Sequence, residues 1–153
     1  MSKSDVTILI NNTAAIRKAV TGAQLEKAAM AGGFVIERAA KINVSSTFSG
    51  KSTGAAGLGG SIQTVVEKTT AKKSTVNVGP TVIYGRIQEL GGVVLPVFAK
   101  MLSWVSDSGE RIFANKVQIP ARPYLRPAVD NNKDDIVDAI SYQLEQQIKK
   151  VAS

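Results

Sequence analysis

Apolar residues recur every three or four positions in two stretches of the chain, which predicts two amphipathic helices. The first runs from Thr21, a candidate N-cap, to about Lys41. The second begins near Asn131 or Asn132 and continues to about Val151, with aspartates in its first turns and lysines in its last. Because this charge distribution complements the helix macrodipole, the C-terminal helix is the more strongly indicated of the two.

A glycine pair, Gly32-Gly33, interrupts the first helical pattern. Each glycine inside a helix costs about 1 kcal/mol relative to alanine. Either two helices meet at this pair, or another part of the backbone packs closely against it. We favour close packing.

Alternating apolar and polar positions predict two antiparallel hairpins. The first pairs residues 62–70 with 74–79, and the second pairs residues 101–105 with 111–119 across a turn containing Asp and Gly. Residues 6–10 are typical of a short strand or an extended arm. Together with the two long helices, these hairpins indicate a single α+β domain over residues 1–153, with a small antiparallel sheet packed by both helices.

Three shorter segments complete the predicted organisation. Residues 82–90 have helical spacing and end at Gly91-Gly92, a typical helix stop. The prolines at positions 120, 123 and 127 predict an extended, stiff connector, because proline restricts both itself and the preceding residue. Residues 45–61 consist almost wholly of Ser, Thr, Gly and Ala, so we expect a flexible loop, and loops of this length are usually functional or disordered.

The composition removes much enzyme chemistry. The 153 residues include no Cys and no His, which excludes disulfides, Cys/His zinc sites, thiol nucleophiles and imidazole bases. Neither Glu37 nor Glu89 has an evident carboxylate partner for acid/base catalysis. No apolar run approaches the roughly 20 residues of a membrane span, and no secretory segment is evident, so we expect an intracellular, non-enzymatic protein.

Two apparent ligand motifs have simpler explanations. Gly50-Lys51-Ser52 resembles the end of a phosphate-binding loop, but Ser45 stands where the first glycine is needed, and the segment follows a helix. Asp130, Asp134 and Asp138 recur every four residues and could hold a hard cation, although helix-terminus electrostatics explains them without one. We therefore predict no cofactor and no metal.

Positive charge is concentrated in the middle of the chain. Residues 41–126 hold eleven of the nineteen basic residues but only four of the twelve acidic ones. This asymmetry is compatible with solubility, with an acidic protein partner or with nucleic acid. Nucleic-acid binding calls for interleaved aromatic residues. Those near the bases lie in patterns that we interpret as core, which weakens that alternative: Phe98, Trp104, Phe113 and Tyr124.

Two stretches, residues 84–92 and 119–128, carry the most information about function. Their aromatic and leucine residues can simply seat the segments on the core. That explanation leaves Arg86, Arg122 and Arg126 without a role, and Arg-rich, proline-stiffened segments beside aromatics have the composition of interface hot spots. Both interpretations stay open.

In these stretches the chain resembles the tail-component or tail-completion proteins of long-tailed bacteriophages, which lie at the head-tail junction. The most specific part is the Pro-Ala-Arg-Pro-Tyr-Leu string at residues 120–125, followed by Pro127-Ala128. A Tyr-small-x-x-x-Glu-x-Gly helix at residues 84–91 and a loose Thr-Gly...Leu-x-x-Ser-Ile element at residues 53–62 accompany it. The chain departs from the pattern at Gly85, where alanine is more usual, and by an apparent insertion at residues 55–57.

The resemblance implies a non-enzymatic virion protein that forms a ring, of six subunits, and is assembled in the host cytoplasm. Its partners would be itself, the tail tube protein and head-completion or connector proteins, with DNA passing through the lumen. The alternative function is nucleic-acid binding through the basic region at residues 41–126. The interface hypothesis names nine residues: Arg86, Glu89, Arg122, Pro123, Tyr124, Arg126, Phe48, Lys51 and Leu58.

Overall fold

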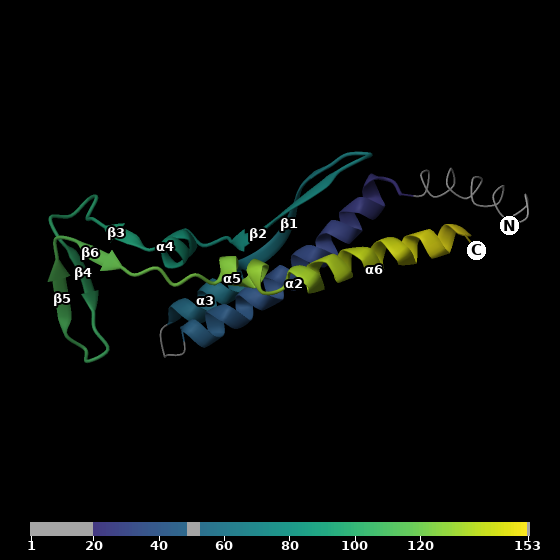
Figure 1. Ribbon diagram of the computed structural model, residues 1–153. Coiled ribbons are helices and arrows are strands. Elements are labelled where there is room, and N and C mark those ends of the chain that lie inside the picture. Colours follow the sequence, from purple (N-terminus) through teal and green to yellow (C-terminus); the bar gives the residue numbers. More distant parts are fainter. Residues whose placement is uncertain (1–19, 49–52, 153) are drawn as a thin grey trace, which may run out of the picture.

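The computed structural model describes residues 20–48 and 53–152, which form five helices and six strands (Figure 1). The strand expected at residues 6–10 lies outside the described residues. The α+β class is confirmed. In chain order the elements are α2 (Gly22–Thr47), α3 (Thr53–Ser61), β1 (Ile62–Thr69), β2 (Ser74–Pro80), α4 (Gly85–Leu90), β3 (Gly92–Val94), β4 (Leu102–Val105), β5 (Arg111–Ala114), β6 (Val117–Ile119), α5 (Leu125–Asp130) and α6 (Lys133–Ala152).

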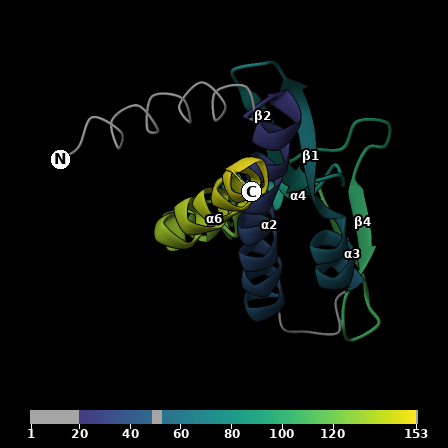
Figure 2. The same ribbon diagram turned by 90° about the vertical axis from the view of Figure 1, so that its right-hand side faces the viewer.

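Helix α2 lies between α6 on one side and the β1–β2 hairpin on the other (Figure 2). The glycine pair makes both contacts possible. A Cβ atom on Gly32 would lie 2.9 Å from Ile140 of α6, and one on Gly33 would lie 2.4 Å from Thr64 of β1. Close packing at this pair is therefore confirmed. Thr21 is the N-cap of α2, as predicted, and the helix extends six residues beyond the expected end at Lys41.

The buried core joins α2 to residues far along the chain. Its fully buried members come from α2, α3, β1 and the start of α5: Ala40, Val44, Leu58, Ile62, Tyr124 and Ala128. Since residues of α2 and of the start of α5 contribute to one cluster although they lie far apart in the sequence, α5 is held against α2 by apolar burial.

The prediction of a flexible loop over residues 45–61 is wrong for most of that segment, because α2 continues to Thr47 and α3 covers Thr53–Ser61. Residues 49–52 lie outside the described residues. Leu58 is buried, Ser61 donates a hydrogen bond from Oγ to the Leu58 carbonyl at 2.7 Å, and Ile62 follows directly in β1. Burial of these side chains outweighs the weak helix propensity of Gly and Ser.

The strands form three separate two-stranded antiparallel sheets. The β1–β2 hairpin is confirmed, with Val66 opposite Val76. The second predicted hairpin is correct as β4–β5 but wrong beyond Ala114, because residues 117–119 pair instead with β3, placing Gly92 opposite Ile119. Residues 92–119, called the distal arm below, thus leave and rejoin the rest of the protein at one point (Figure 1).

The expectation of an extended connector holds for residues 120–123 and is wrong from Leu125 on, because Leu125–Asp130 form α5. Pro127 is the third residue of this helix. The first N–H groups of a helix have no partner within it, so a proline there sacrifices no hydrogen bond.

Candidate functional site

Glu89 of α4 joins the two stretches that the sequence singled out. Its carboxylate accepts hydrogen bonds from three successive backbone N–H groups: Tyr124 at 2.7 Å, Leu125 at 2.9 Å and Arg126 at 3.0 Å. These are the unpaired donors at the start of α5, so a carboxylate from a distant part of the chain takes the place of a local cap. The Arg122 backbone N–H adds a bond of 2.8 Å to the Gln88 carbonyl.

Tyr124 is completely buried at this junction, with 0% of its surface exposed. Its hydroxyl donates to the Gly85 carbonyl at 3.2 Å, and its own carbonyl accepts a hydrogen bond from Asn43 at 2.9 Å. Burial, together with the nearby Glu89 carboxylate, raises the pKa of the Tyr124 phenol from 10.0 to about 12. Tyr124 is therefore a structural residue in the free subunit.

The structure accounts for a glycine at position 85. A Cβ atom at this position would lie 2.3 Å from Pro80 Cγ and 3.2 Å from the Tyr124 hydroxyl oxygen. The close approach of α4 to the end of β2 leaves no space for a methyl group.

The nine candidate interface residues differ in their surroundings. Glu89, Tyr124 and Leu58 are turned inward and hold the subunit together. The exposed candidates are Arg86, Arg122, Pro123 and Arg126, while Phe48 is half-buried and lies beneath Arg122, whose guanidinium carbon is 5.4 Å from the ring centre. This distance is typical of a cation–π contact. Lys51 lies outside the described residues.

The distal arm is the largest functional candidate that the sequence analysis missed. Half of the exposed large hydrophobic residues in the described chain lie between Val93 and Phe113, and no residue of the arm is buried. Phe98 is 102% exposed and Val97 is 82% exposed. The interpretation of Phe98, Trp104 and Phe113 as core residues is wrong, because the arm projects away from α2 and α6 (Figure 1).

Both faces of the β4–β5 hairpin are apolar. Trp104 lies opposite Ile112 on one face, and Phe113 lies opposite Ser103 on the other. Neighbouring residues in a strand point to opposite faces, so the consecutive pairs Trp104-Val105 and Ile112-Phe113 place apolar side chains on both. An isolated two-stranded hairpin is marginally stable at best in water, and no residue of this one is buried by the part of the chain that the structure describes.

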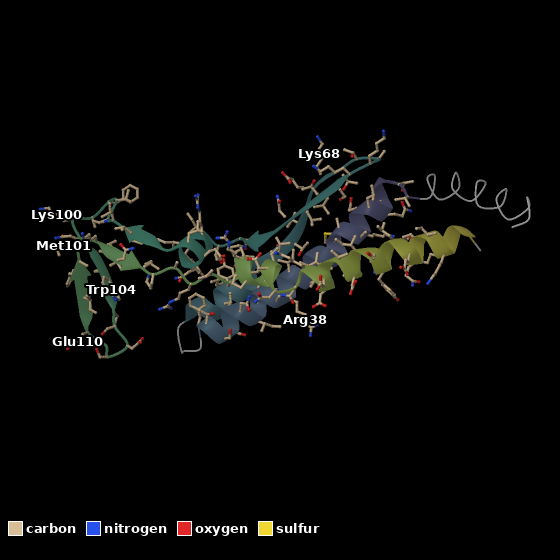
Figure 3. The ribbon with its side chains drawn as sticks, in the orientation of Figure 1. Arg38, Lys68, Lys100, Met101, Trp104 and Glu110 are labelled. Carbon is tan, nitrogen blue, oxygen red and sulfur yellow. The ribbon has the colours of Figure 1, made fainter. Side chains whose placement is uncertain are left out.

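The basic residues of the described chain are spread along the length of the molecule. Lys68 lies near the far end of the β1–β2 hairpin, whereas Lys100 lies in the distal arm at the opposite end of the molecule (Figure 3). Arg86, Arg122 and Arg126 belong to α4, the segment before α5 and α5 itself, which lie between these two places (Figure 1).

The described residues contain no group of three or more His, Cys, Asp or Glu side chains arranged to hold a metal ion. Within the same residues, no helix is long and apolar enough to cross a membrane. The chain matches no protein-family model, no curated protein and no solved structure. Function therefore has to be argued from the sequence pattern and the geometry.

Proposed function

We propose that the protein is a non-enzymatic assembly component of a bacteriophage virion. In this proposal it forms a ring at the head-tail junction, of six subunits, that completes the tail and docks it to the head. Its partners are further copies of itself, the tail tube protein and head-completion proteins.

The exposed apolar surface of the distal arm is the observation that carries this proposal. Monomeric proteins rarely leave a large contiguous apolar patch in water, and such patches usually mark protein contacts. Trp104 and Phe98 belong to the residue types enriched at the centres of interfaces. The resemblance of residues 84–91 and 120–128 to tail-completion proteins supplies the biological setting.

Native mass of the full chain tests the proposal, measured alone and mixed with the neighbouring tail proteins. We expect a closed oligomer in at least one of these conditions and incorporation of the chain into tails. A chain that stays monomeric in both, and is missing from finished particles, would contradict it.

Nucleic-acid binding is the second candidate, and the structure adds one observation in its favour. The aromatic residues Phe98, Trp104 and Phe113 are exposed on the same arm as Lys100 and Arg111. Aromatic side chains beside cations form stacking platforms for single strands.

Salt dependence separates the two functions. Binding through several phosphate contacts weakens steeply with added salt, while an assembly protein should bind bare DNA weakly at any salt concentration. Titration of a fluorescent oligonucleotide at two salt concentrations is sufficient. The nucleic-acid function would be favoured if the protein bound the oligonucleotide tightly at low salt and the affinity fell steeply with added salt. The Lys100→Gln variant should then bind more weakly.

A further inference from the structure

The two ends of the elongated subunit present different surfaces. The distal arm occupies one end, and the C-terminal part of α6 extends toward the other (Figure 1). A contact between unlike surfaces at opposite ends is heterologous, and such contacts generate rings when the rotation between subunits closes.

The outer face of α6 carries exposed residues at helical spacing, away from α2. Ile136 and Ile140 face Gly32 of α2, whereas the residues on the opposite side of the helix are exposed. Two of these are apolar, Val137 at 59% and Tyr142 at 60% exposure. We call this surface the outer α6 face; it consists of Asp134, Val137, Asp138, Ser141, Tyr142 and Glu145.

The outer α6 face and the distal arm are complementary in charge. The face carries three carboxylates among its apolar residues, with Lys149 one turn beyond it. The arm has exposed cations at Lys100, Arg111 and Lys116, and its two acidic residues both lie in the turn at the tip of β4–β5. Lys100 is the single charged residue between Val93 and Ser106.

Apolar residues accompany the charges on both surfaces. Residues 95–101 form an irregular segment after β3, in which Leu95, Val97, Phe98 and Met101 are exposed. On α6, Tyr142 lies one turn beyond Asp138, so an apolar side chain that contacts Tyr142 also lies next to a carboxylate. Phe98 is fully exposed and precedes Lys100 by two residues, so these two side chains can meet Tyr142 and Asp138 together.

We propose that the distal arm of one subunit docks on the outer α6 face of the next copy, with Phe98 against Tyr142. Lys100 then lies beside the carboxylates of Asp134 and Asp138. This inference rests on the proposed ring function and names the two surfaces that build the ring.

Disulfide trapping tests this contact directly, because the chain contains no cysteine. One preparation carries Phe98→Cys and a second carries Tyr142→Cys. Under mild oxidation we expect covalent dimers when the two preparations are mixed, and few when either is oxidised alone. A double variant should give a ladder of species that ends at the ring.

The matched control mixes Phe98→Cys with Lys72→Cys, an exposed position in the β1–β2 turn. It should give little trapping. Equal trapping in the control and test mixtures, or none in either while the protein is oligomeric, would overturn the proposed contact.

Charge reversal supplies an independent readout. Lys100→Glu and Asp138→Lys should each weaken association by up to about fivefold, since exposed ion pairs contribute at most about that much. The combined variant should return association to within about twofold of the original protein. Phe98→Ala should weaken association by tenfold or more, whereas Ile83→Ala, equally exposed but outside the arm, should leave it unchanged.

These experiments distinguish the two proposals. An oligomer that forms normally in all these variants keeps the ring function and rejects the arm-to-α6 contact. A protein that is monomeric under every condition rejects both. Trapping of Phe98→Cys to a different virion protein, with none to a second copy, assigns the arm to that protein and also rejects the contact.

Discussion

Glu89 shows how one side chain can organise two distant segments. It is half-buried and serves three backbone donors at once, and all three belong to the start of α5. Hydrogen bonds to a charged acceptor are roughly twice as strong as those between neutral groups. The Tyr-x-x-x-x-Glu pattern of α4 and the Arg-Pro-Tyr-Leu string therefore belong to one local structure, although about thirty residues separate them.

Replacing Glu89 with Gln should lower the free energy of unfolding by about 1.5 to 3 kcal/mol. A glutamine has one acceptor oxygen, so in either orientation its amide group faces at least one of the three backbone donors. Denaturant titration followed by circular dichroism measures the change. The control Glu110→Gln, at an exposed position in the arm, should change the free energy of unfolding by less than about 0.5 kcal/mol. If both variants lost the same free energy of unfolding, the hydrogen bonds of Glu89 to the start of α5 would not contribute to stability.

The raised pKa of Tyr124 predicts a loss of stability at high pH. The phenol ionises near pH 10 in the unfolded chain and at about 12 in the folded one, so its contribution is complete below pH 10 and disappears as pH rises to about 12. Unfolding midpoints measured across this window should fall more steeply in the original protein than in Tyr124→Phe. If the unfolding midpoints of the two proteins fell in parallel with pH, the Tyr124 phenol would be exposed to water in the folded protein.

At the scale of elements, the packing of α2 depends on the glycine pair. Gly33→Ala should destabilise the protein by about 1 to 3 kcal/mol, even though alanine favours helix. The new methyl group would meet Thr64, which cannot turn away freely because its hydroxyl donates to the Glu37 carboxylate at 2.8 Å. Thermal unfolding measures the effect.

Gly60→Ala is the matched control for that substitution. A Cβ atom on Gly60 of α3 would have no neighbouring atom within 4 Å. The gain in helix propensity should therefore appear alone, as a stabilisation of about 0.5 to 1 kcal/mol. If both variants are stabilised, α2 has room to move away from β1.

Elements with a strong local pattern could be predicted from the sequence, and those made by long-range burial could not. Helix α6 has both the apolar stripe and the charged ends, and the β1–β2 strands alternate clearly. Helix α3 consists largely of Gly, Ala and Ser, so nothing local indicates that Leu58 reaches the core. Helix α5 is capped by Glu89 from another part of the chain, and the prolines at positions 120, 123 and 127 predict an extended segment in its place.

The same limit applies to the candidate site. The sequence singled out residues 84–92 and 119–128, and these stretches meet in the structure, but several residues chosen there serve the fold. The distal arm was missed because aromatic residues in alternating strands usually belong to a core. A usable signal was present: Trp104-Val105 and Ile112-Phe113 are adjacent apolar pairs in short strands, and such pairs make both faces of a hairpin apolar.

At the scale of the whole molecule, the arm can be followed by its own fluorescence. Trp104 is the only tryptophan in the chain and lies in β4. Its emission should be that of a partly solvated indole in the free subunit and should shift to shorter wavelength on assembly, as water is excluded from the arm. Unchanged emission across the transition would mean that the surface around Trp104 stays outside the contact.

The pairing of Gly92 with Ile119 has a practical consequence for engineering. Strands that meet side by side can be joined by a two-residue turn. Replacing residues 93–118 with Asn-Gly should yield a shortened protein that retains the helical circular dichroism and cooperative melting of its parent. If the proposed contact between the arm and α6 is correct, this shortened protein could accept the arm of one neighbouring copy but would have no arm to offer the next, so it should stop the growth of a ring.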